Sequence, residues 1–110
     1  MDKRKENWSY FQERHARSHK AYEEFGKALS VDGPLGEREQ ALIKVGVAAA
    51  SQYDYALRSH IERARVCGCT DEEIEHAILL VATTAGFPRM MTALLVMREE
   101  FEAMRAESDD

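Results

Sequence analysis

Apolar residues recur at three- and four-residue steps along most of the chain, and this spacing is typical of one face of an α-helix. The first such stripe predicts a single long helix in the N-terminal 30 residues, with His15 and Ser18 as a polar insert. The apolar members of the stripe are Trp8, Phe11, Tyr22, Phe25 and Leu29. The segment VDGPLG at residues 31–36 follows, and its glycines and proline predict the end of that helix.

A second helix is predicted over about Glu37 to Ala50. Its second half, LIKVGVAAA, is apolar on nearly every face, which is typical of a helix buried on all sides. A domain this small cannot easily enclose such a helix by itself. We therefore expect contacts with a second subunit.

A third helix is predicted over about Gln52 to Val66, with Ser51 as its N-cap and Asp54 as the capping partner. The segment CGC closes the helix, and Gly68 suits the left-handed position after a helix end. One face carries a row of residues at helical spacing. Its members are Tyr53, Ala56, Leu57, His60, Ile61 and Ala64.

The segment TDEEI predicts the start of a fourth helix, because Thr70 and Glu73 have the spacing of a capping box. The predicted core face of this helix consists of Ile74, Ala77, Ile78, Val81 and Ala82. The segment GFP ends it, and Pro88 suits the first position of a fifth helix.

The fifth helix has its own stripe, and the last residues, 106–110, are expected to form a frayed tail. The stripe consists of Met91, Leu94, Leu95, Arg98, Phe101 and Met104. The whole chain, 1–110, is thus predicted to be one all-α domain of about five helices. The N-terminal helix covers 1–30 and the core covers 31–105.

Composition narrows the classes of function. Hydrophobic residues make up 45% of the chain and charged residues 32%, as in globular proteins. The net charge of −5 argues against a nucleic-acid partner, which would require a clustered positive surface. Lys44 interrupts the longest apolar run, so we expect no membrane span. The N-terminus has no apolar signal segment and there are only two cysteines, so we expect a cytoplasmic protein with reduced thiols.

The segment from about Phe25 to Phe101 resembles the carboxymuconolactone decarboxylase and alkylhydroperoxidase D-like family. The resemblance is carried by DGPLGEREQALIKVGVAAA, YDYALRSHIERARVCGCTDEEI and VATTAGFPRMMTALLV, in that order. It implies an all-helical fold and a homo-oligomer, either a trimer or a hexamer built as a trimer of dimers.

The resemblance also separates two kinds of family member. Peroxidase-type members carry C-x-x-C-x-x-x-H with a glutamate about a dozen residues earlier. In this chain the cysteine positions hold Tyr53 and Ala56, the glutamate position falls near Ala41, and only His60 remains. A thiol peroxidase needs a thiolate and a second, resolving thiol, which these residues cannot supply. The segments ALRSHI and AGFPRM match the decarboxylase-type members better.

The resemblance favours a decarboxylase-like lyase or isomerase that acts on a small lactone or carboxylic acid and uses no cofactor. His60 is the candidate general acid/base, since the pKa of an unperturbed histidine is about 6.5; a packed core histidine is the alternative. Arg63 and Arg89 are candidates to hold a substrate carboxylate, and Tyr53 is a candidate pocket wall. Arg58 points to nearly the opposite side of its helix and is expected to make a surface or subunit contact.

Two alternatives remain open at the level of sequence. Cys67 and Cys69 could support a peroxiredoxin-like thiol function at a relocated site, or the chain could be a non-catalytic oligomeric accessory protein. His15 and His19 are four residues apart, a spacing able to bind a metal. No acid or cysteine near them completes a ligand set, so we predict no metal site.

Overall fold

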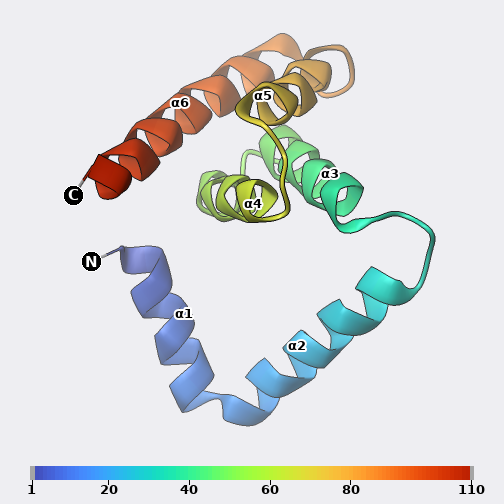
Figure 1. Ribbon diagram of the computed structural model, residues 1–110, viewed down its shortest axis with the longest axis vertical. Helices are drawn as coiled ribbons and strands as arrows, with labels where there is room; N and C mark the ends of the chain where they lie inside the picture. Colours follow the sequence, from blue (N-terminus) through green and yellow to red (C-terminus); the bar gives the residue numbers. More distant parts are fainter. Residues whose placement is uncertain (1, 110) are drawn as a thin grey trace. The chain divides into compact units, whose positions relative to one another are not determined.

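The computed structural model describes residues 2–109, and every regular element in that range is helical. The elements are α1 (Lys3–Arg14), α2 (Ala16–Val31), α3 (Glu37–Ala50), α4 (Asp54–Val66), α5 (Asp71–Leu79), the 3-10 turn η1 (Leu80–Thr83) and α6 (Phe87–Asp109) (Figure 1). The all-α prediction is confirmed. The chain divides into two compact units, residues 1–35 and 36–110. No described helix combines the length and apolar character that a bilayer crossing requires.

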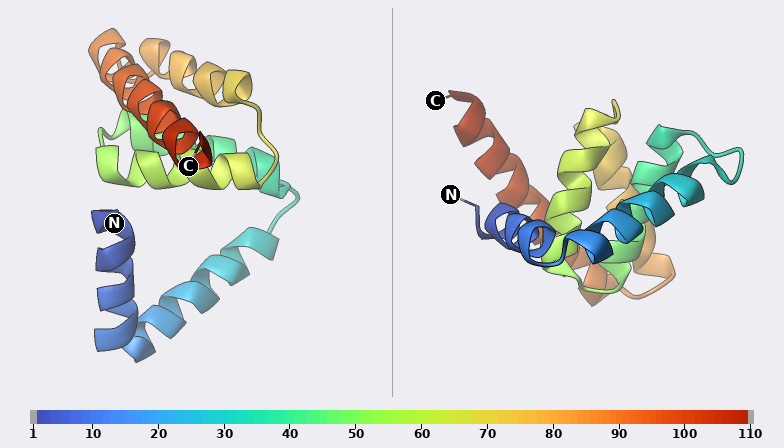
Figure 2. Two further views of the ribbon diagram at one scale, coloured as in Figure 1. Left: turned by 60° about the vertical axis from the view of Figure 1, so that its left-hand side comes forward. Right: turned by 90° about the horizontal axis from the view of Figure 1, so that it is seen from below.

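The hydrophobic core lies in the unit 36–110, where α3, α4, α5 and α6 pack together (Figures 1 and 2). Small residues on the inner face of α3, namely Ala41, Ala48 and Ala49, let α4 approach closely. Large side chains fill the space between the helices. Those buried most completely are Val45, Leu57, Ile61, Ile74, Ile78 and Met97.

The turn between α3 and α4 differs from the prediction. Ser51 is the C-cap of α3, not the N-cap of α4, because α3 continues to Ala50 and the Ser51 amide donates to the carbonyl of Val47. Gln52 then adopts a positive φ of 58°. The amide of Tyr53 donates to the Ala48 carbonyl at 3.0 Å, which completes a Schellman motif. Two helices joined by so short a turn form a hairpin.

The turn between α4 and α5 has the predicted chemistry. Gly68 adopts a φ of 90° after the end of α4, and the Cys69 amide donates to the carbonyl of Ala64 at 2.9 Å. Thr70 and Glu73 form the predicted capping box: the Glu73 amide donates to Thr70 Oγ1 at 3.1 Å, and the Thr70 amide donates to Glu73 Oε1 at 2.8 Å. Glu73 also pairs with Arg38, which links the first turn of α5 to that of α3.

The last helix starts one residue earlier than predicted, at Phe87, so Pro88 occupies its first turn. Gly86 precedes it with a φ of 121°. Arg58 of α4 contacts Glu99 at 2.9 Å and Glu100 at 3.5 Å, and so ties α4 to α6 within one chain. The predicted tail at 106–110 is helical as far as Asp109.

The unit 1–35 contains two helices where one was predicted. The backbone leaves the helical region at His15, with φ −132° and ψ 56°. The break brings the Trp8 ring to 5.1 Å from the ring of His19 and 6.2 Å from that of Tyr22. In a straight helix Trp8 and Tyr22 would be about 21 Å apart. Aromatic packing therefore accompanies the bend, although α1 and α2 contain no fully buried residue.

Candidate functional site

His60 is half-buried on the side of α4 that faces α3. Its helical neighbours Leu57, Ile61 and Ala64 are fully buried, which anchors the histidine at the edge of the core. Burial lowers the pKa of His60, and the positive charge of Lys44 on α3 lowers it further. The imidazole is therefore neutral at pH 7, and one ring nitrogen is available to accept a proton.

Lys44 influences His60 but is not among the site residues predicted from the sequence. It is exposed and lies on α3, the helix that packs against α4 most extensively. One signal was visible in the sequence: Lys44 is the only charge within the apolar run ALIKVGVAAA. That the charge acts on His60, however, follows only from the packing of the two helices.

The positions at which the sequence resemblance would place two thiols and a carboxylate carry neither group here. Tyr53 is exposed at the N-cap of α4, Ala56 is partly buried one turn before His60, and Ala41 is buried on α3. Glu39 does not replace the carboxylate, since its side chain folds back over Gly36 at the start of α3.

The two arginines predicted to hold a substrate carboxylate lie in different settings. Arg63 is exposed and follows His60 by one turn of α4. Arg89 belongs to α6, and its Nη1 donates to the Ala50 carbonyl at 2.7 Å, at the end of α3. Arg89 thus has a structural contact. Arg63 shares a helix with His60. That Arg63 or Arg89 binds a substrate carboxylate stays a prediction.

The cysteines are both free thiols. Cys69 is only 6% exposed, and its Sγ lies 3.7 Å from the backbone carbonyl oxygen of Arg38, to which it donates. Cys67 is half-buried at the carboxyl end of α4, seven residues after His60 and thus about 10 Å along the helix axis. The thiols and His60 therefore occupy different parts of α4 and the turn that follows it.

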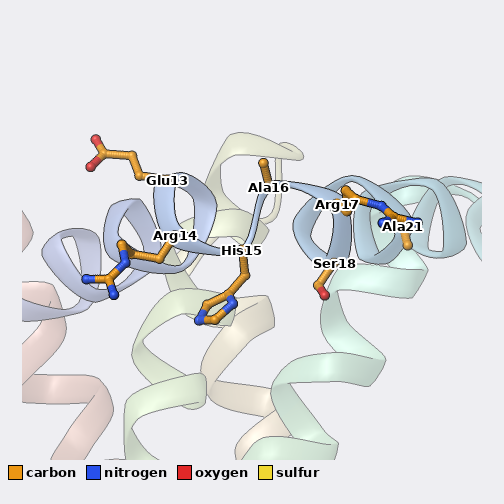
Figure 3. Close-up of a pocket in the computed structure, with 7 residues that line it drawn as sticks. All are labelled: Glu13, Arg14, His15, Ala16, Arg17, Ser18 and Ala21. Atoms are coloured by element: carbon orange, nitrogen blue, oxygen red, sulfur yellow. The ribbon is translucent and has the colours of Figure 1, made fainter.

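Two surface hollows lie away from His60. One is at the bend between α1 and α2, where the side chains of Glu13, Arg14 and Ser18 point in different directions and do not converge (Figure 3). The other lies where the end of α4 meets the last turns of α6. It is lined by Glu62, Arg65, Val66, Met104, Glu107 and Ser108. His60 is not among the residues that line either hollow.

The histidine pair of the first unit is not arranged as a metal site. His15 interrupts the helix, while His19 packs against the rings of Trp8 and Phe11. His19 Nε2 lies 3.3 Å from Glu23 Oε1, within ion-pair distance, but forms no hydrogen bond. Among residues 2–109, no three side chains of His, Cys, Asp or Glu come together as a set of ligands.

Comparison with known proteins gives two matches. Residues 16–99 match the sequence profile of the family described as the carboxymuconolactone decarboxylase family. An 82-residue stretch is 33% identical to a protein of Paracoccus denitrificans described as "Uncharacterized protein 4 in cox locus". That alignment covers 72% of this chain and 74% of the relative.

Proposed function

Because this chain belongs to the carboxymuconolactone decarboxylase family, we propose that it is a cofactor-free lyase or isomerase acting on a small lactone or carboxylic acid. His60 is its general acid/base. The observation that supports this role is a half-buried imidazole on α4 whose pKa is lowered by burial and by the charge of Lys44, so that the ring is neutral and able to accept a proton at pH 7.

The chemistry follows from the charge state of the imidazole. Neutral His60 takes a proton from a carbon next to the substrate carbonyl, which leaves an enolate and an imidazolium. Return of that proton to another carbon of the enolate completes an isomerisation. In a decarboxylation, loss of CO₂ from the carboxylate leaves the enolate directly, and His60, protonated from water, delivers the proton.

Substrate binding is assigned to residues near the ends of α4. Arg63, one turn beyond His60, can form two parallel hydrogen bonds with a carboxylate. Tyr53, at the other end of the same face, serves as a wall of the site. Arg89 is the second carboxylate candidate; its contact with Ala50 uses Nη1 and leaves the other guanidinium donors for a substrate.

The enzyme is proposed to act as a homo-oligomer, a trimer or a hexamer. Ile43 and Val47 on α3 are 51% and 59% exposed, although the helix around them is apolar. Val47 lies one turn beyond Lys44 on the same helix, so a second copy that covers Val47 would also approach Lys44. The active site would then be completed at the subunit interface.

The thiol alternative has less support. Attack on a peroxide requires an accessible thiolate, whereas Cys69 is buried and Cys67 lies at the negative, carboxyl end of α4. The remaining alternative is a non-catalytic accessory oligomer.

The test is a nuclear magnetic resonance screen of small lactones and unsaturated carboxylic acids in D₂O, in which proton transfer appears as deuterium uptake at carbon and decarboxylation as product formation. His60→Gln should lower the rate on any accepted substrate about 10²- to 10⁴-fold, the usual contribution of a general acid/base. The matched control is His76→Gln, on the exposed side of α5, which should retain the wild-type rate. An active His60→Gln variant would disprove the assignment.

A further inference from the structure

We propose that α2 is a docking surface for a second copy of this chain, in which the two α2 helices pack antiparallel about a twofold axis near Phe25. The surface, called the α2 stripe below, consists of Tyr22, Phe25 and Leu29, with Ser18 and Asp32 at its two ends. This inference goes beyond the proposed function, because it concerns the N-terminal unit and none of the residues assigned to catalysis.

The first support is that the N-terminal unit leaves this stripe uncovered. Tyr22, Phe25 and Leu29 share one face of α2 and are 61%, 62% and 58% exposed. The ring of Trp8 on α1 packs against Tyr22, and beyond that contact α1 and α2 diverge from their bend (Figure 2). In residues 3–31 no side chain is fully buried. Helices of 12 and 16 residues without a core are only marginally stable in water, so the stripe needs a cover from outside this unit.

The second support is the order of polar groups along the same face. Ser18 precedes Tyr22 by four residues and Asp32 follows Leu29 by three, so both continue the stripe. In an antiparallel pair centred on Phe25, positions nearly equidistant from the centre face each other. Tyr22 then faces Leu29 of the second copy, and the hydroxyl of Ser18 can donate to the Asp32 carboxylate. Apolar layers lie in the middle, and a polar contact closes each end.

The third support is the charge at the two ends of α2. Its first turn carries Arg17 and no acidic residue, and Asp32 is its C-cap. Both charges are unfavourable in an isolated helix, whose amino end is positive and whose carboxyl end is negative. In the antiparallel pair each end lies beside the opposite end of the other helix. Arg17 therefore approaches Asp32 of the second copy at both ends, and this complementarity favours antiparallel over parallel packing.

The fourth support is the space on both sides of Phe25. Gly26 stands in the middle of α2, where glycine weakens a helix relative to alanine. Apart from its chain neighbours and the local helix backbone, no described atom lies within 4 Å of the position that a Cβ would take there. Ala21 and Ala28 flank the other side of the stripe. These small residues let a second helix approach closely around the two Phe25 rings.

An anionic membrane is a poorer cover for the stripe. The chain has a net charge of −5, which opposes adsorption to a negative surface. Helices that lie on membranes are rich in Lys and Arg on their polar side, whereas Glu23 and Glu24 stand between Tyr22 and Phe25. A second copy, with its complementary ends, fits these charges better.

The experiment starts from Val47→Glu, which removes the contact proposed for α3, so that the α2 contact alone joins two chains. Light scattering coupled to size-exclusion chromatography should find a dimer at micromolar concentration. Phe25→Glu in this background should raise the dissociation constant at least about tenfold, because a charge would be buried at the centre of the pair. Val31→Glu, on the far side of α2 from the stripe, is the matched control and should leave the dimer unchanged.

A charge exchange tests the direction of packing. Arg17→Asp places two acids at each end of the pair and should weaken the dimer severalfold, although it suits the positive end of its own helix. The added Asp32→Arg should restore the affinity. The two residues are 15 positions apart in one helix, about 22 Å, so the rescue can only act between chains.

A disulfide tests the position of the axis. In a chain without its natural thiols, Cys67→Ser/Cys69→Ser, the added Gly26→Cys should form a disulfide between two chains under mild oxidation, because position 26 lies close to the axis. Lys27→Cys, the next residue but on the far side of α2, is the matched control and should stay a free thiol.

Three outcomes overturn the inference: a monomeric Val47→Glu protein, equal dimer affinity in Phe25→Glu and Val31→Glu, or equal disulfide yields at positions 26 and 27. A monomer that binds phosphatidylglycerol vesicles through Phe25 would instead show that the stripe faces a membrane. None of these results depends on turnover, so failure of His60 as the general acid/base would leave them unchanged.

Discussion

The pKa of His60 on α4 is lowered by burial and, across the helical hairpin, by the positive charge of Lys44 on α3. Neither residue is remarkable by itself: one is an exposed lysine and the other a half-buried histidine. Together they give the chain a neutral base next to a fixed positive charge. Their relationship connects the packing of two helices to the chemistry proposed for this family member.

Stability should depend on the protonation of His60. Its folded-state pKa is lowered, so the unfolded chain binds a proton more readily as the pH falls through about 6.5. Stability contributed by neutral His60 is therefore complete above that pH, declines below it, and levels off below the folded-state pKa. Urea unfolding between pH 5 and 8 should show this decline in wild type. His60→Gln should show a smaller decline, and equal pH profiles for the two proteins would contradict the prediction.

The core of the unit 36–110 can be tested with two valines of opposite exposure. Val45 is 0% exposed on α3, whereas Val66 is 75% exposed at the end of α4. Val45→Ala should lower the free energy of unfolding by roughly 1–3 kcal/mol, since it removes two buried methyl groups and leaves a cavity. Val66→Ala should change it by less than about 0.5 kcal/mol. Similar losses in urea unfolding for the two variants would show that α3 is not packed as described.

The capping box of α5 should contribute measurably to folding. Thr70→Ala removes the oxygen that accepts from the Glu73 amide and should cost about 1 kcal/mol in the free energy of unfolding. Thr70→Ser keeps a hydroxyl and should lose less than half of that amount. Thermal unfolding followed by circular dichroism provides the measurement. A Thr70→Ala variant as stable as wild type would mean that the cap does not stabilise the helix.

Peroxide should oxidise the two thiols slowly and independently. Cys67 is half-buried and Cys69 is buried, so Cys67 should also react faster with a thiol reagent in the native protein. Thiol loss after addition of stoichiometric hydrogen peroxide should be compared in wild type, Cys67→Ser and Cys69→Ser. A rapid loss that requires both cysteines would instead support the peroxiredoxin-like alternative and move the active site to the turn after α4.

Assembly should depend on the exposed apolar residues of α3. Val47→Glu places a charge at the surface proposed to meet a second copy, so light scattering coupled to size-exclusion chromatography should show smaller particles than in wild type. Val66→Glu, also at an exposed valine, is the matched control and should leave the mass unchanged. A wild-type protein that elutes as a monomer at micromolar concentration would contradict the proposed oligomer.

The sequence was sufficient to predict the parts of the fold that depend on local chemistry. The capping box of Thr70 and Glu73 and the left-handed Gly68 were predicted and are confirmed. The core face predicted for the fourth helix does pack in the core, but α5 ends at Leu79, so Val81 and Ala82 lie in the 3-10 turn η1. Each depends on residues within a few positions of one another. The same holds for the helical class of the whole chain, which the spacing of apolar residues reveals.

Features that depend on contacts between helices were not predicted. The break at His15 has no glycine or proline to mark it and accompanies ring packing between residues more than ten positions apart. Ser51 closes α3 although its residue type also suits the start of a helix. Lys44 was read only as an interruption of an apolar run, because its position beside His60 is set by tertiary packing.

The division of the chain between residues 35 and 36 predicts which helices unfold locally first. Among the described residues, every fully buried side chain lies in the second unit. Amide groups there should therefore exchange with solvent deuterium only after a cooperative opening. The slowest amides should accordingly lie in α3, α4, α5 and the first half of α6. The amides of α1 and α2 should exchange first, and their loss would leave the side chains around His60 and Lys44 with their packing within that second unit intact.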